Sequence, residues 1–109
     1  MNALKNLPEN PAMLAELIDV HPGQVVSMSL SRNDAIRMTL FAFDGGEGVS
    51  EEAYDSDTFY YILEGSMTLV REGATHTMPA GSVAAVPAGV SHAIGGDAPF
   101  KLLQVNLAL

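Results

Sequence analysis

Short apolar segments alternate with turn residues along most of the chain, from Gln24 onward. Apolar runs of roughly four to eight residues, bounded by Gly, Pro, Asn and Asp, are typical of β-strands. Eight such strands are expected, over residues 25–30, 36–43, 58–63, 66–71, 75–78, 82–86, 92–94 and 100–107. Strands this short, with turns this frequent, favour an all-β sandwich or a closed barrel over an α/β arrangement.

The residues before the first strand form a different kind of segment. Residues 1–24 are interpreted as an N-terminal lead-in, and residues 25–109 as a single β-domain. Asn10-Pro11 is a typical start for a short helical turn. The apolar residues that recur after it at helical spacing are Met13, Leu14, Leu17 and Ile18.

The strand expected at 58–63 is apolar on both of its faces. One face carries Thr58, Tyr60 and Ile62, and the other carries Phe59, Tyr61 and Leu63. A strand that is apolar on both sides is normally covered on both sides. We expect one face to line the interior of the domain and the other to pack against a second layer or a second copy of the chain, which predicts a homodimer.

Composition narrows the class of partner. The 109 residues suit one domain, and a hydrophobic fraction of 48% is enough to fill its core. Thirteen acidic residues against five Lys and Arg give a net charge of −8. Nucleic acid and anionic membranes are therefore poor partners. A cationic or neutral small molecule, or a divalent metal, is compatible with this charge. There is no cysteine, no apolar window of the roughly 20 residues that a membrane helix needs, and no signal peptide is recognised, so a cytoplasmic location is expected.

One motif near the C-terminal end carries a family resemblance. Gly81, Pro87, Gly89 and His92 occupy their places in the pattern G-x5-P-x-G-x2-H-x3-N, and only its final position departs, with Gly96 in place of Asn. This resembles the second conserved motif of the cupin superfamily. The resemblance implies a small jelly-roll β-barrel like that of the compact single-domain bacterial cupins. His92 shares its strand face with Val90 and Ile94, so we expect it to point to an apolar interior.

The first cupin motif, G-x5-H-x-H-x3–4-E-x6-G, is matched only at its end. Gly65 stands at its last glycine, and counting back places Thr58 where the family has a glutamate. With the shorter spacing, Glu52 and Tyr54 replace the two histidines; with the longer spacing, Glu51 and Ala53 do. The shorter spacing is preferred because it leaves two side chains that can coordinate.

The resemblance also suggests where a site lies. Cupins usually bind Mn, Fe, Ni or Zn through three histidines and a carboxylate, a donor set that suits such metals. Here His92 and Glu52 remain as the candidate metal ligands, a thin set beside the three protein ligands of a catalytic zinc site. Tyr54 would coordinate less readily, because a phenol must first lose its proton, and Asp55 or Asp57 could supply a further ligand. The residues expected to bind a small molecule in the barrel are His92, Glu52, Tyr54, Thr58 and Tyr60.

Two further features stand out. Six acids and no base lie between residues 44 and 57, which indicates either a solvated loop over the barrel mouth or a mouth that attracts cations. Arg37 is a lone arginine within an expected strand and could meet a carboxylate at the pocket or at a subunit contact.

Three functions are compatible with the sequence. The first is a small-molecule-binding cupin with a degenerate metal site and no redox chemistry. The second is a metal-dependent enzyme, of dioxygenase or isomerase type, that uses His92 and Glu52. The third is a structural dimer scaffold whose interior is plugged by Tyr60, Met67 and Met78. Fold alone does not choose among them, so whether the chain is an enzyme stays open.

Overall fold

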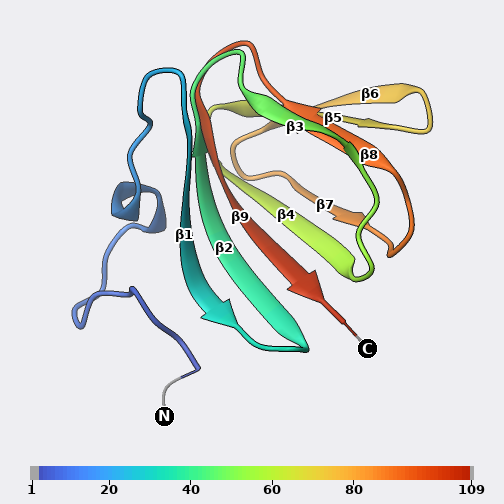
Figure 1. Cartoon of the computed structure of the whole chain (residues 1–109). Helices are drawn as coiled ribbons and strands as arrows, with labels where there is room; N and C mark the ends of the chain where they lie inside the picture. The colour runs from blue at the N-terminus through green and yellow to red at the C-terminus, as the bar shows by residue number, and fades with distance from the viewer. Residues whose placement is uncertain (1–2, 109) are drawn as a thin grey trace.

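The computed structural model describes residues 3–108 and shows an all-β fold of two antiparallel sheets that face each other (Figure 1). The first sheet has five strands in the order β1-β2-β9-β4-β7, and the second has four in the order β3-β8-β5-β6. The strands are β1 (Val25–Arg32), β2 (Ile36–Phe43), β3 (Gly48–Glu52), β4 (Asp57–Glu64), β5 (Ser66–Arg71), β6 (Ala74–Pro79), β7 (Val83–Val86), β8 (His92–Gly95) and β9 (Phe100–Leu107). This is the jelly-roll arrangement expected from the sequence. No helix in the described residues is long and apolar enough to cross a membrane.

A single glycine carries the chain from one sheet to the other. Gly65 separates β4 in the first sheet from β5 in the second and has a φ of 75°, a left-handed conformation that suits glycine. A side chain at this position would also collide with the carbonyl oxygen of Pro99. The glycine that ends the first motif is therefore required by the fold itself.

All eight expected strands are present, and their ends differ from the expected ones by at most two residues. The most consequential shift is in β1, which continues to Arg32 rather than ending at Leu30. A ninth strand, β3, was not expected, because Val49 is its one apolar residue in a segment otherwise made of Gly, Ser and Glu. Backbone pairing with β8, which aligns Val49 with Ile94, holds it in the sheet instead. The expectation of a solvated loop over residues 44–57 is thus wrong for this part.

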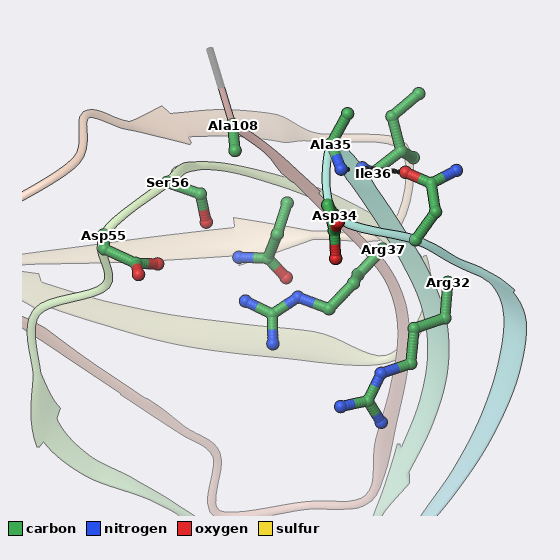
Figure 2. Close-up of a pocket in the computed structure, with 10 residues that line it drawn as sticks. Arg32, Asp34, Ala35, Ile36, Arg37, Asp55, Ser56 and Ala108 are labelled. Carbon is green, nitrogen blue, oxygen red and sulfur yellow. Dashed lines mark hydrogen bonds between the residues drawn. The ribbon is translucent and has the colours of Figure 1, made fainter.

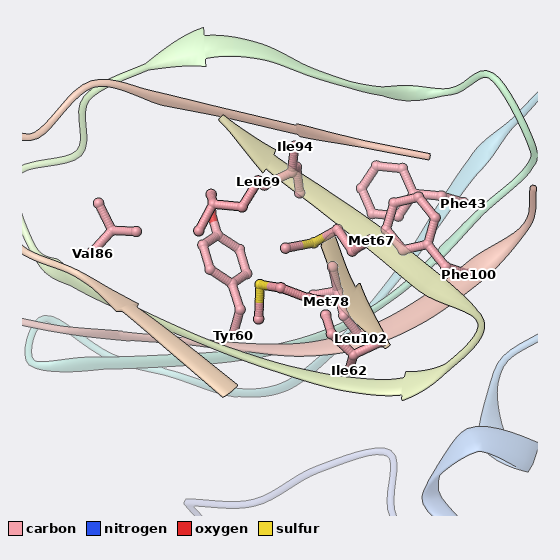
Figure 3. Packing of buried hydrophobic residues seen from close by; sticks show 10 residues of the cluster. All are labelled: Phe43, Tyr60, Ile62, Met67, Leu69, Met78, Val86, Ile94, Phe100 and Leu102. Atoms are coloured by element: carbon pink, nitrogen blue, oxygen red, sulfur yellow. The ribbon is translucent and has the colours of Figure 1, made fainter. Parts of the chain in front are cut away.

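The main core lies between the two sheets (Figure 3). Phe43 and Phe100 stack with ring centroids 4.6 Å apart, and Tyr60, Met67 and Met78 fill the space beside them. The alternation of β4 explains this packing, since Thr58, Tyr60 and Ile62 are buried while Phe59 and Tyr61 remain about one-third exposed on the outer face. The inner face of β4 is therefore packed, and its outer face is only partly covered within this chain.

A second cluster forms outside the five-stranded sheet. The expected helical turn is a single 3-10 turn, η1 (Leu14–Leu17), which begins after Met13 without a side-chain cap. The lead-in runs alongside β1 (Figure 1), and its Ile18 is buried with Leu30, Leu40 and Ala42. Lys101 donates a 2.8 Å hydrogen bond to the carbonyl of Ala15, which fastens the lead-in to β9. The lead-in thus covers the outer face of β1 and β2.

Candidate functional site

His92 lies inside the domain, as its alternation with Val90 and Ile94 predicts, and both of its ring nitrogens are engaged. The side chain is only 4% exposed. Its Nδ1 lies 3.1 Å from the carbonyl oxygen of Val90, and its Nε2 lies 2.8 Å from the hydroxyl of Tyr60. Because a carbonyl only accepts, the neutral ring carries its proton on Nδ1, and Tyr60 then donates to Nε2. The imidazole is a fully hydrogen-bonded interior group.

Two tyrosines flank this histidine. The rings of Tyr54 and Tyr60 each meet the imidazole edge-on, with centroids 5.7 Å away. Burial raises the pKa of Tyr60, and the neighbouring Tyr54 and Glu52 raise it further. Burial also raises the pKa of Tyr54, as does Glu52, while Arg37 lowers it. Both phenols are therefore protonated at neutral pH, which fits the role of Tyr60 as a hydrogen-bond donor.

Thr58 belongs to a second buried polar chain. Asn106 donates a 2.9 Å hydrogen bond to the Thr58 hydroxyl, and Gln104 donates a 3.0 Å bond to the Asn106 side-chain oxygen. All three side chains are at least nine-tenths buried. The interior of the domain thus changes from apolar to polar along β9, from Phe100 to Asn106.

The residues around His92 do not fit the metal centre usual in the family that the motifs resemble. Among residues 3–108, no three His, Asp or Glu side chains are grouped so that they could hold a metal ion. His92 and Glu52 are paired across β8 and β3, but Glu52 is exposed and the His92 Nε2 is already bonded to Tyr60. Thr58 offers a hydroxyl that already accepts a hydrogen bond from Asn106.

A polar cleft lies beside these groups, over one face of the adjacent strands β1, β2 and β9. It consists of two adjoining pockets of about 340 and 580 Å³ that share Arg32, Arg37 and Asn106. The smaller pocket is also lined by Ser27, Ser29, Ser31, Thr39, Phe41, Tyr54 and Gln104. The larger one opens toward the 33–36 turn, Asp55 and Ser56 (Figure 2). Pockets of this size and polarity are large enough for a small metabolite.

The expected ligand-binding residues are not all gathered at this cleft. Tyr54 lines it, whereas His92, Tyr60 and Thr58 lie buried behind it and Glu52 is exposed on β3. The cleft is built chiefly by residues that the motifs did not indicate. The sequence did carry a signal for this cleft. Polar side chains replace apolar ones at every second position of two strands, as Ser27 and Ser29 do in β1 and Gln104 and Asn106 do in β9.

The acids between residues 44 and 57 do not converge on one point. Asp44 accepts the backbone N–H of Gly23, Asp57 accepts that of Ala88, and Glu51 accepts the hydroxyl of Ser91. These contacts tie neighbouring loops together. Three of the six acids therefore have local structural partners.

A family match agrees with this architecture. The cupin domain pattern matches residues 39–106, more than half of the chain, and takes in both motifs. The chain belongs to the cupin family.

Several solved structures resemble this chain over most of its length. A cupin superfamily protein from Desulfitobacterium hafniense is 43% identical, covers 97% of this chain and 98% of its own, and gives a TM-score of 0.94. A conserved protein of unknown function from Streptococcus pyogenes is 22% identical and covers 100% of this chain and 96% of its own. Its TM-score of 0.95 shows a shared fold, and at this identity it shows the fold alone. A cupin 2 conserved barrel domain protein from Leptotrichia buccalis is 26% identical over 87% of this chain and 46% of its own, with a TM-score of 0.84. No match was found among curated proteins.

This cupin's departure from the second motif has a steric reason. Gly96 stands where the motif has Asn, and a Cβ there would lie 2.9 Å from the Phe100 ring and 3.0 Å from the carbonyl oxygen of Ser66. Phe100 in turn stacks on Phe43 at the centre of the core. The aromatic pair therefore occupies the space that a side chain at position 96 would need.

Proposed function

We propose that this cupin binds a small molecule in the cleft over β1, β2 and β9, without a metal centre. The observation that carries this proposal is the hydrogen bond between Tyr60 and His92. It occupies Nε2 of His92, while a polar cavity remains open on the side of Tyr54, whose ring meets the imidazole. Serine and threonine hydroxyls and the Gln104 and Asn106 amides supply both donors and acceptors to that cavity.

The packing of the barrel bears on the scaffold alternative. Tyr60, Met67 and Met78 do fill one half of the interior, as that alternative requires (Figure 3). The cleft lies outside this packed part, over the five-stranded sheet, and its lining is largely polar. A polar pocket of this size beside a packed core favours a binding role over a pure scaffold.

One observation favours the enzyme alternative. Glu52 and His92 are direct neighbours across β3 and β8, so the carboxylate and the imidazole lie on adjacent strands. With the Tyr60 bond broken, His92 and Glu52 would be the first ligands of a divalent Mn, Fe, Ni or Zn.

Elemental analysis separates these two functions. Protein purified without chelator and without a metal-binding tag is expected to hold less than stoichiometric Mn, Fe, Ni or Zn. Heteronuclear NMR with a set of small polar compounds is expected to show saturable shifts at Thr39, Tyr54 and Gln104. Stoichiometric metal that disappears in His92→Ala would overturn the proposal in favour of the enzyme.

We also propose that the chain is a homodimer. Phe59 and Tyr61 on β4 are 37% and 36% exposed, Val83 on the adjacent β7 is 58% exposed, and Leu107 on β9 is 46% exposed. This outer face is apolar although the chain carries a net charge of −8, so the charged residues are concentrated elsewhere. A self-complementary apolar face is typical of a two-fold interface.

A further inference from the structure

Two arginines face each other at the junction of the two pockets. Arg32, the last residue of β1, is the direct cross-strand partner of Arg37 in β2, and both line both pockets. Like charges placed directly opposite on antiparallel strands repel each other. In a chain with only five Lys and Arg, two of them are therefore placed together on one wall of one cleft.

The described residues place no carboxylate in contact with this pair. Within residues 3–108 the one ion pair is Lys101–Glu64, so no described carboxylate lies within 4.0 Å of either guanidinium. Asp34 and Asp55 line the larger pocket but remain beyond that distance. They reduce the positive potential of the cleft without occupying the guanidinium groups.

A buried hydroxyl at the same place has no partner. Ser56 is 5% exposed, lines the larger pocket with the two arginines, and its Oγ makes no hydrogen bond in the described structure. Figure 2 shows this hydroxyl and the Arg37 guanidinium both directed into the space between β2 and the 55–56 segment. A buried polar atom without a partner costs free energy, so a ligand that bonded it would be stabilised there.

We infer that Arg32, Arg37 and Ser56 form a binding subsite for the carboxylate group of a small, polar, singly charged organic acid. This inference rests on the proposed binding function and names the chemical class of its ligand. Guanidinium groups pair with carboxylates through parallel hydrogen bonds, and the Ser56 hydroxyl donates a further one. The two nearby aspartates disfavour a doubly charged phosphate. The polar remainder of the ligand extends into the smaller pocket, toward Tyr54 and Thr39.

The test compares a carboxylate with a neutral amide of nearly the same shape, and both with a phosphate. The full chain, labelled with ¹⁵N, is titrated with sodium lactate, with the neutral lactamide and with inorganic phosphate, all at one ionic strength because exposed charges are screened by salt. Lactate is expected to shift the resonances of Arg32, Arg37 and Ser56 saturably, and lactamide to bind about tenfold more weakly or worse. Lactamide binding as tightly as lactate, or phosphate binding more tightly, would overturn the carboxylate assignment.

Substitutions that each remove one positive charge show which arginines bind the carboxylate. Arg37→Gln and Arg32→Gln are each expected to weaken lactate binding about tenfold, because each removes a charge-assisted hydrogen-bond donor. Arg71→Gln changes the net charge equally, but Arg71 lies on β5 and donates to the carbonyl of Ala85, so lactate binding should be unchanged. An equal loss in all three variants would show a general charge effect and would overturn the subsite.

Ser56→Ala provides a readout that a merely structural role would not give. Removing an unpaired buried hydroxyl should leave the free protein at least as stable while weakening lactate binding several-fold. Unchanged lactate affinity in this variant would remove Ser56 from the subsite. If lactamide and other neutral compounds bind in the cleft and lactate does not, only the carboxylate inference fails; if no compound of either charge binds, the proposed function itself fails.

Discussion

The hydroxyl of Tyr60 and Nε2 of His92 lie 2.8 Å apart, and this contact joins the two sheets through the interior of the domain. Tyr60 comes from β4 of the five-stranded sheet and His92 from β8 of the four-stranded sheet. The residue that the family resemblance marks as a metal ligand is here part of a cross-sheet hydrogen bond. The Tyr60 hydroxyl should therefore contribute to the stability of the fold.

Removing the Tyr60 hydroxyl should destabilise the fold. Tyr60→Phe leaves the buried His92 Nε2 without a donor, and an unsatisfied buried group of this kind costs about 1–3 kcal/mol. Urea denaturation measures the free energy of unfolding. Tyr61→Phe, one residue away on the outer face and 36% exposed, is the control and should change it by less than about 0.5 kcal/mol. Equal effects of the two substitutions would show that the hydrogen bond contributes nothing.

Stability should fall in alkaline solution. The folded protein holds the Tyr60 proton more tightly than the unfolded chain, because burial raises the pKa of Tyr60 above the ordinary value of 10.0. The stabilisation is therefore complete below about pH 10 and is lost as the pH rises toward the pKa of folded Tyr60. Tyr54, whose pKa is also raised by burial, adds to the same trend. Urea midpoints measured from about pH 8 to pH 11 should fall less steeply in Tyr60→Phe than in the wild type; parallel curves would contradict this.

Two neighbouring glycines should respond differently to the same substitution. Gly96→Ala would press a methyl group against Phe100 and the Ser66 carbonyl, and overpacking of this kind costs about 1–3 kcal/mol. In Gly95→Ala the new methyl group would lie 3.7 Å from its closest contact, the carbonyl oxygen of Glu47, which is an ordinary distance. Thermal unfolding of both variants is the measurement, with the larger loss expected at position 96. A smaller loss there than at position 95 would contradict the steric account.

A charge on the outer face of β4 should separate the proposed dimer. Phe59→Lys places an ammonium group in the apolar face, where it cannot be hydrated once a second copy covers it. Sedimentation equilibrium should give a dimer mass for the wild type and a monomer mass for this variant. Val70→Lys, at a position 38% exposed on β5 of the other sheet, should remain dimeric. A monomeric wild type would rule out the interface.

Local patterns in the sequence were sufficient for most of the fold. The alternation of β4 and β9, and the turns around Gly65 and Pro87, predicted the strands because each signal is contained in a few consecutive residues. Val49 shows where this fails. Its strand, β3, has too little apolar sequence of its own and exists because β8 pairs with it.

The same distinction between local sequence pattern and tertiary packing applies to the candidate site. The sequence by itself determined a jelly-roll cupin with His92 directed inward, because strand alternation and a spaced motif are local properties of the chain. Only the tertiary structure decided that Tyr60 bonds this histidine and that Arg32 and Arg37, paired across two strands, line one pocket with Ser56. Those relationships depend on strand register and on the approach of two sheets, which are set by the packing of residues far apart in the chain.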